Sequence, residues 1–143
     1  PYLLDVNLLI ALAWPSHVHH TEAQLWFAHK RKVGFRTCPL TQTGFVRLSS
    51  NSKFTPDAVS PANAVGLLHE ITGLDEHEFW PDTLSLDAAL RKLGRLMAGH
   101  QQVTDAYLTG LALSRGGILA TFDRGAAALS PATELVGAIS KKH

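Results

Sequence analysis

The chain has 143 residues, of which 45% are hydrophobic and 17% are charged, and these values predict one folded domain over residues 1–143 rather than a disordered chain. Its 13 lysines and arginines nearly balance its 12 acidic residues, so the net charge of +1 excludes a polycation and makes any nucleic-acid contact local. The single cysteine, Cys38, excludes an intrachain disulfide and a zinc-thiolate cluster, and the longest apolar run, residues 8–14, is too short to span a membrane. We therefore expect a cytoplasmic protein that makes no contact with a membrane.

Apolar runs alternate with helical patterns along the chain, which predicts an α/β domain with a mainly parallel sheet. The helices are bounded by residues that start or stop helices, such as Pro15, the Ser60–Pro61 pair and the Gly116–Gly117 pair. In the first half of the chain, we expect a strand at 2–4, helices at 6–13 and 19–32, a strand at 34–38 and a helix at 40–50. A further helix starts at 60–61 and stays apolar on one face to 71, and a strand follows at 77–80. In the last part of the chain, we expect helices at 85–93 and 102–115, a strand at 118–122, a helical turn at 126–129 and a strand at 134–136.

Three aspartates are expected at one edge of this sheet. Asp5 and Asp123 each follow a strand directly, and Asp105 stands at the start of the helix at 102–115. The carboxyl ends of parallel strands open into a common crevice, and a helix N-terminus stabilises negative charge. Each position also suits an aspartate that only caps a helix or forms a turn, so both roles stay open for any one of the three.

Convergence of these aspartates would have an electrostatic consequence. Carboxylates within a few ångströms repel one another and hold protons at neutral pH unless a cation lies among them. Oxygen ligands alone suit Mg²⁺ or Mn²⁺ better than zinc. Such an ion polarises a phosphoryl oxygen and activates water for attack on a phosphodiester. Asp5, Asp105 and Asp123 are therefore the candidate catalytic and metal-binding residues.

Three segments carry the aspartates: residues 3–10 read LLDVNLLI, residues 103–108 read VTDAYL and residues 119–125 read LATFDRG. In order and spacing they resemble the first, third and fourth acidic motifs of PIN domains, the small metal-dependent nucleases, and most of all those of the VapC toxins. The resemblance covers nearly the whole chain. It implies a single PIN-like domain with a central sheet of four or five mainly parallel strands and helices on both faces.

The resemblance also implies a function and partners. VapC-like toxins are endoribonucleases that need Mg²⁺ or Mn²⁺ and hydrolyse RNA phosphodiester bonds with a metal-activated water. The family pairs with VapB antitoxins and often forms homodimers. By residue, the resemblance makes Asp5 and Asp105 metal ligands, and it makes Asp123 a ligand that binds directly or through water.

Further residues near the three motifs have roles implied by the resemblance or suggested by their position. Asn7, Thr104 and Thr121 would support the aspartates by hydrogen bonding, although each also suits an ordinary place in a first helical turn, a helix cap or a strand. The candidate contacts with RNA are Arg124, Arg47, His17, His20 and Trp14.

One position departs from the family pattern. PIN domains usually carry a glutamate in the helix after the second strand, and here that stretch, residues 41–48, reads TQTGFVRL with Gly44 in its place. The change removes one carboxylate and favours a single tight metal site over two. It leaves open an alternative function, in which a catalytically weakened PIN-like domain binds RNA or a protein.

Overall fold

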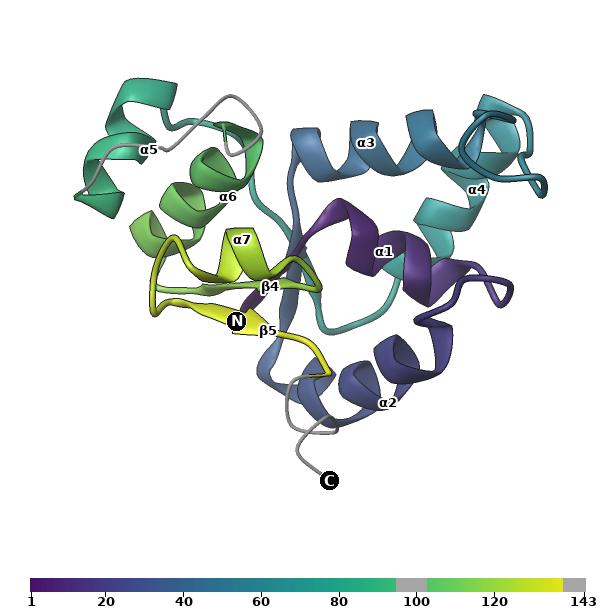
Figure 1. Ribbon diagram of the computed structural model, residues 1–143, viewed down its shortest axis with the longest axis horizontal. Helices are drawn as coiled ribbons and strands as arrows, with labels where there is room; N and C mark the ends of the chain where they lie inside the picture. Colours follow the sequence, from purple (N-terminus) through teal and green to yellow (C-terminus); the bar gives the residue numbers. More distant parts are fainter. Residues whose placement is uncertain (95–102, 138–143) are drawn as a thin grey trace.

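Five short parallel strands form the central sheet of the computed structural model, which describes residues 1–94 and 103–137 (Figure 1). The strands lie in the order β3-β2-β1-β4-β5, and every neighbouring pair is parallel. Their bounds are Tyr2–Leu4 for β1, Phe35–Thr37 for β2, His77–Phe79 for β3, Ile118–Thr121 for β4 and Thr133–Leu135 for β5. The expected parallel sheet is confirmed, with β1 at its centre.

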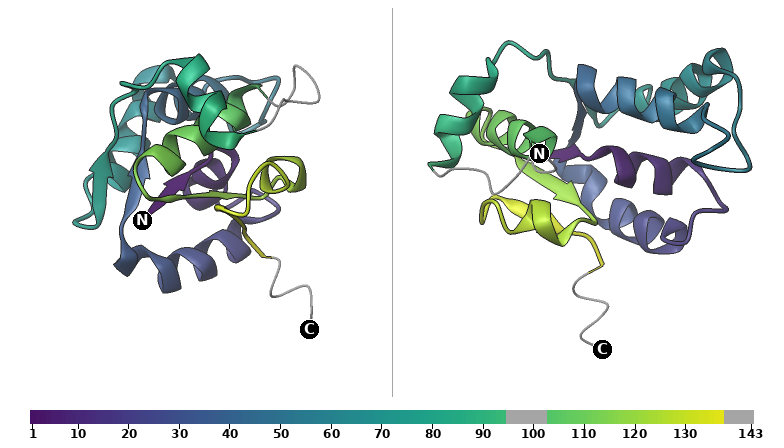
Figure 2. Two further views of the ribbon diagram at one scale, coloured as in Figure 1. Left: turned by 90° about the vertical axis from the view of Figure 1, so that its left-hand side faces the viewer. Right: turned by 45° about the horizontal axis from the view of Figure 1, so that its top comes forward.

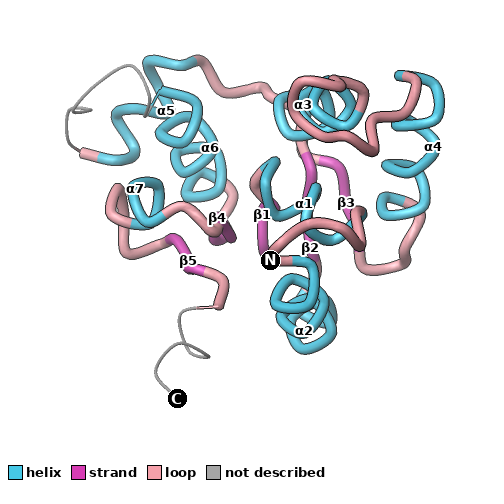
Figure 3. Tube along the Cα trace, turned by 45° about the vertical axis from the view of Figure 1, so that its right-hand side comes forward, coloured by secondary structure: helices cyan, strands magenta, loops and turns pink. Residues whose placement is uncertain are grey.

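Seven helices connect the strands within the described residues. Their bounds are Val6–Ala13 for α1, His20–Lys30 for α2, Pro39–Ser49 for α3, Pro61–Thr72 for α4, Leu86–Leu93 for α5, Val103–Ser114 for α6 and Arg124–Ala127 for α7. Figures 2 and 3 show α5 and α6 on one side of the sheet and α1 to α4 on the other. The expectation of helices on both faces is therefore confirmed.

The alternation of side chains along β1 explains why both faces are covered. Tyr2 and Leu4 belong to a core shared with α1, α2 and α3, whereas Leu3 belongs to a second core shared with α5 and α6. Successive strand residues point to opposite faces of a sheet, and all three side chains are buried. A fully apolar central strand therefore requires an apolar layer on each side.

Several helix ends differ from the sequence-based expectation. The helix expected at 19–32 ends at Lys30 and continues as a 3₁₀ turn, Arg31–Val33, before Gly34 turns the chain into β2 with a φ of 101°. The turn expected at 126–129 begins earlier, at Arg124, because Asp123 caps it. The helix expected at 102–115 is described from Val103 onward, and Gln102 lies outside the described residues.

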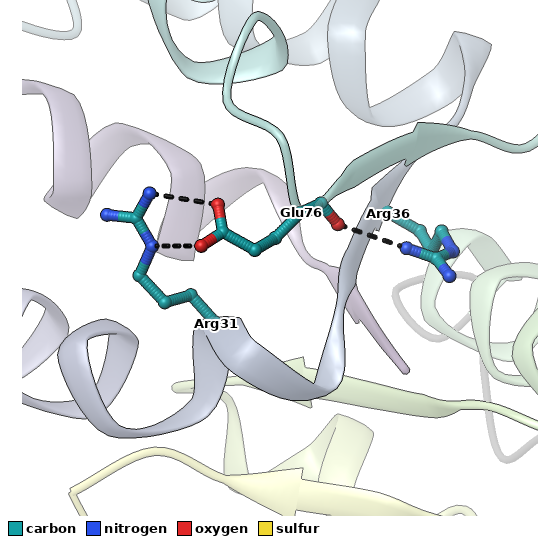
Figure 4. A network of polar contacts seen from close by, with 3 residues as sticks. All are labelled: Arg31, Arg36 and Glu76. Atoms are coloured by element: carbon teal, nitrogen blue, oxygen red, sulfur yellow. Dashed lines mark hydrogen bonds and ion pairs between the residues drawn. The ribbon is translucent and has the colours of Figure 1, made fainter.

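A network of charged side chains holds the amino ends of β2 and β3 together (Figure 4). Arg31 donates two hydrogen bonds to the Glu76 carboxylate, at 2.9 and 3.1 Å, and Arg36 donates one to the Glu76 carbonyl oxygen at 3.3 Å. Glu76 directly precedes β3, whereas Asp5 and Asp123 follow β1 and β4. In a parallel sheet these positions lie at opposite edges. Arg31 and Arg36 therefore stabilise the fold and lie away from the strand ends that Asp5 and Asp123 follow.

Among residues 1–94 and 103–137, the helices are all too short or too polar to cross a lipid bilayer.

Candidate functional site

Asp5 lies at the carboxyl end of β1, where it caps helix α1. One carboxylate oxygen accepts a hydrogen bond from the Val6 backbone N–H at 2.8 Å, and the other accepts one from the Thr121 hydroxyl at 2.8 Å. Only 6% of the residue is exposed. Burial raises the pKa of the Asp5 carboxyl, the hydrogen bonds from Thr121 and Val6 lower it, and the nearby charge of Asp123 raises it again.

Thr121 joins Asp5 to Asp123. Its hydroxyl donates to Asp5 and accepts a hydrogen bond from the Asp123 backbone N–H at 3.0 Å, and its side chain is fully buried. Asp123 itself is exposed and caps α7, where it accepts a hydrogen bond from the Gly125 backbone N–H at 2.7 Å. The ordinary role of an aspartate as a helix cap therefore applies to Asp5 and to Asp123, and it brings both carboxylates to the same edge.

Asp105 comes from the other side of the sheet, in the first turn of α6, and is partly buried. Its pKa is raised from 3.8 to about 6, first by burial and then by the charges of Asp5 and Asp123. Since the charges of Asp5 and Asp123 both act on Asp105, its side chain lies within electrostatic reach of the two strand ends that these residues follow, and we call this edge of the sheet the aspartate edge. The three aspartates come from different parts of the fold: Asp5 follows β1, Asp105 lies in α6, and Asp123 follows β4.

The chemistry of this edge suits a hard divalent cation. Within the described residues, no group of three or more histidine, cysteine, aspartate or glutamate side chains is arranged to hold a metal ion on its own. Magnesium sites commonly use only one or two carboxylates and complete the coordination with water. Val6 and Thr121 each donate one hydrogen bond to a different Asp5 oxygen, and a carboxylate oxygen has a further lone pair for a cation.

The two other expected supporting residues lie differently. Asn7 is exposed in the first turn of α1, and within residues 1–94 and 103–137 no hydrogen bond links its side chain to a carboxylate. Thr104 is exposed in the first turn of α6. Thr121 contacts two aspartates because its side chain lies at a strand end between them, and the supporting roles of Asn7 and Thr104 stay predictions.

The two arginines expected to contact RNA are both exposed. Arg124 is the first residue of α7 and directly follows Asp123, so its side chain starts at the aspartate edge. Arg47 lies on α3 and lines a groove between α3 and α4.

The other three expected RNA contacts lie beyond the carboxyl end of α1. The Nδ1 atom of His20 lies 2.7 Å from the carbonyl oxygen of Ala11, so this ring ties α2 to α1. The Trp14 indole N–H donates to the hydroxyl of Ser49 at 3.0 Å. The Nδ1 atom of His17 accepts a hydrogen bond from the His19 backbone N–H at 3.0 Å, and His17 and Trp14 line one cavity.

Gly44 packs against the segment that follows β1. A Cβ atom at Gly44 would lie 2.7 Å from Cγ2 of Val6, closer than such atoms approach one another. Helix α3 therefore approaches α1 at the residue next to Asp5. Gly44, which stands where the family pattern has a glutamate, therefore lies beside the site. In this chain the space next to it is occupied by the side chain of Val6.

Sequence reasoning missed a contact next to Asp123. The rings of His19 and Phe122 stack with their centroids 4.8 Å apart, and the Nδ1 atom of His19 lies 3.1 Å from a carboxylate oxygen of Glu22. This contact joins the start of α2 to the residue before Asp123. No local sequence pattern predicts this stacking, because the two residues are far apart in the sequence.

The fold is shared with a solved toxin structure. VapC20 of Mycobacterium tuberculosis, described as a sarcin-ricin loop cleaving toxin, superposes with a TM-score of 0.65 at 17% identity, over 90% of this chain and 95% of that one. No protein-family model matches the chain.

Sequence comparison then identifies the family. Ribonuclease VapC39 of M. tuberculosis is 45% identical over 121 residues, which cover 85% of this chain and 87% of that protein. Ribonuclease VapC38 of the same species is 46% identical over 123 residues, which cover 86% of this chain and 85% of that protein. The chain therefore belongs to the VapC family of PIN-domain proteins.

Proposed function

We propose that this chain is a metal-dependent endoribonuclease toxin that hydrolyses phosphodiester bonds in RNA. The observation that carries the proposal is the placement of aspartates at one edge of the sheet, where Thr121 joins Asp5 to Asp123 by two hydrogen bonds and Asp105 lies within reach of both their charges. Its second support is the 45% identity to a protein named a ribonuclease. Buried carboxylates that repel one another are costly unless they bind a cation.

Asp5 and Asp105 would hold Mg²⁺ or Mn²⁺, and Asp123 would reach the ion directly or through water. When bound, such an ion supplies the Lewis acidity and the activated water that phosphodiester hydrolysis requires. The backbone N–H of Val6 and the hydroxyl of Thr121 fix the orientation of the Asp5 carboxylate.

Arg124 and Arg47 would bind RNA phosphates. Both side chains are exposed, and neither forms an ion pair with an acidic side chain of the described residues. An arginine beside the aspartate edge would hold the phosphate chain against the negative charge of the carboxylates. Replacing either residue is expected to weaken RNA binding more at low salt than at high salt, because the variant neutralises fewer phosphates and its affinity depends less steeply on salt.

The proposal includes the partners of the family. A VapB-like antitoxin would cover the aspartate edge and suppress cleavage, and two copies of the chain would form a homodimer in the cytoplasm. Sedimentation or gel filtration of the purified chain, alone and with a co-expressed antitoxin, tests both associations directly.

The decisive experiment compares three purified proteins on the same RNA: the wild type, Asp5→Asn and the control Asp75→Asn, whose side chain is exposed in the loop before β3. We expect cleavage by the wild type and the control with Mg²⁺ or Mn²⁺, none in EDTA, and none by Asp5→Asn. Cleavage that survives in EDTA, or that persists in Asp5→Asn, would contradict the proposal.

Two observations favour a second candidate, a domain that binds RNA without cutting it. Gly44 stands in place of the usual glutamate, and the described carboxylates do not form a metal-binding group on their own. This candidate predicts equal RNA binding with and without EDTA, and intact RNA in both conditions. The same three proteins, assayed by filter binding beside cleavage, separate the two functions.

A further inference from the structure

A cavity of about 300 Å³ opens beyond the carboxyl end of α1, between the α1–α2 loop and the loop after α3. Its aromatic lining comes from Trp14, His17 and Phe54, and its polar lining includes Ser16 and Asp57. The volume is at the small end of the range for ligand-binding sites. It therefore suits a small flat group rather than a large molecule.

Hydrogen bonds hold the walls of this cavity in place. The Ser16 hydroxyl donates to the Asp57 carboxylate at 2.7 Å and joins the two loops. The Trp14 indole N–H is bound to Ser49 at 3.0 Å, which fixes the ring against α3. Phe54, by contrast, is 45% exposed although it is large and apolar. The cavity is thus preformed, with an aromatic ring left open to solvent beside it.

A chain of rings connects the cavity with the aspartate edge. The ring of His17, in the cavity wall, lies 5.8 Å from that of His19, and His19 stacks on Phe122 at 4.8 Å. Phe122 directly precedes Asp123. Helix α1, which separates Asp5 from Trp14, has eight residues and is about 12 Å long. A single strand bound at the aspartates is therefore within a few nucleotides of the cavity.

The lining distinguishes between chemical classes of ligand. Aromatic rings bind flat π systems, and stacking on them is the usual means by which proteins bind single-stranded bases. The Asp57 carboxylate repels a phosphate, but it accepts hydrogen bonds from an amino group. Among nucleobases, cytosine, adenine and guanine carry such a group and uracil does not.

We propose that this cavity binds one unpaired nucleobase of the RNA, one with an exocyclic amino group, which stacks on Phe54 and Trp14 and donates to Asp57. The inference rests on the proposed function, because it names a substrate feature of the same reaction. It makes the cavity a specificity site, separate from the carboxylates that would cut the chain.

The first test needs no catalytic activity. Cytidine and uridine differ at position 4 of the base, where cytidine has an amino group and uridine a carbonyl oxygen, and neither carries a phosphate. We expect cytidine, titrated to about 10 mM, to shift the NMR signal of the Trp14 indole N–H, and uridine to shift it much less. The variant Phe54→Ala should weaken the cytidine response. Equal shifts with both nucleosides, or none with cytidine, would overturn the inference.

The second test uses the RNA substrate and measures KM and kcat. A set of RNAs is made, each with one abasic nucleotide at a different position around the cleavage site. Each RNA is assayed with the wild type, with Phe54→Ala and with Phe79→Ala, a control whose side chain on β3 is 44% exposed. One abasic position should raise the KM of the wild type and the control about fivefold or more, while kcat changes little. The same substitution should leave the already raised KM of Phe54→Ala unchanged.

The outcomes of the two tests separate the inference from the proposed function. If the wild type cleaves RNA but no abasic position matters, or if Phe54→Ala and Phe79→Ala behave alike, the cavity does not bind a base. If the wild type cuts no RNA, the proposed function fails, and the nucleoside titration alone decides whether the cavity binds a base.

Discussion

Replacing Asp105 with asparagine is expected to make the metal-free protein more stable at pH 7. The substitution keeps the size of the side chain and removes one of three negative charges that act on one another. A pKa raised from 3.8 to about 6 corresponds to roughly 3 kcal/mol against the charged form. Since Asp105 is only partly buried, solvent screening reduces the expected gain to about 1–2 kcal/mol.

The pH dependence of this gain follows from the direction of the shift. The folded protein holds the Asp105 proton more tightly than the unfolded chain does, so ionisation costs stability as the pH rises from about 4 through 6. The difference in free energy of unfolding between Asp105→Asn and the wild type should be small near pH 4. It should grow up to about pH 6 to 7 and stay constant above that.

Urea denaturation in EDTA at pH 4, 5, 6, 7 and 8 measures the difference in free energy of unfolding between Asp105→Asn and the wild type. The control Asp75→Asn should unfold with the same free energy as the wild type at each pH. Addition of Mg²⁺ or Mn²⁺ should raise the melting temperature of the wild type and leave that of Asp105→Asn nearly unchanged, because one of the ligands is lost. The reasoning fails if Asp105→Asn is less stable than the wild type at pH 7 in EDTA, or if their difference is independent of pH.

Two further substitutions test the packing and hydrogen bonding around the site. Thr121→Val removes the hydroxyl that donates to Asp5, so it should lower the free energy of unfolding by about 1–3 kcal/mol and slow RNA cleavage. The control Thr121→Ser keeps a hydroxyl and should retain most of the stability and most of the cleavage rate. Equal losses in the two variants would show that the hydrogen bond is not the cause. Gly110→Ala would place a Cβ atom 2.3 Å from the backbone oxygen of Ala89 and should destabilise the contact between α5 and α6 by about 3 kcal/mol. The matched variant Gly66→Ala meets no atom within 4 Å and should stabilise α4 by up to about 1 kcal/mol, and urea denaturation that found the two glycine variants alike would contradict the packing argument.

The positions of Asp5 and Asp123 could be predicted because their causes are local. Each follows a short apolar strand, and each caps the helix that comes next by accepting a backbone N–H one or two residues ahead. Asp105 was placed from its position at a helix start in the same way. Local patterns of this kind involve neighbouring residues, and one sequence contains them completely.

The electrostatic properties of the site could not be predicted from such patterns. The pKa of Asp105 depends on how deeply α6 packs against the sheet and on how close that packing brings Asp5 and Asp123. Thr121 can bridge Asp5 and Asp123 only because β4 lies beside β1. The order of the strands in the sheet decides that neighbourhood. The supporting role of Asn7 stays a prediction, since its side chain is exposed in the first turn of α1.

The sequence by itself determined most of the secondary structure, the class of fold and the three aspartates that we propose for the site, since each follows from periodicity, caps and a family pattern within short segments. The tertiary structure decided what surrounds those residues. The stack of His19 on Phe122 and the cavity between residues 10–17 and 54–57 both join segments that are distant in the chain. Contacts of this kind depend on how helices cross the sheet and pack on one another, and no short-range pattern in the sequence encodes those crossings.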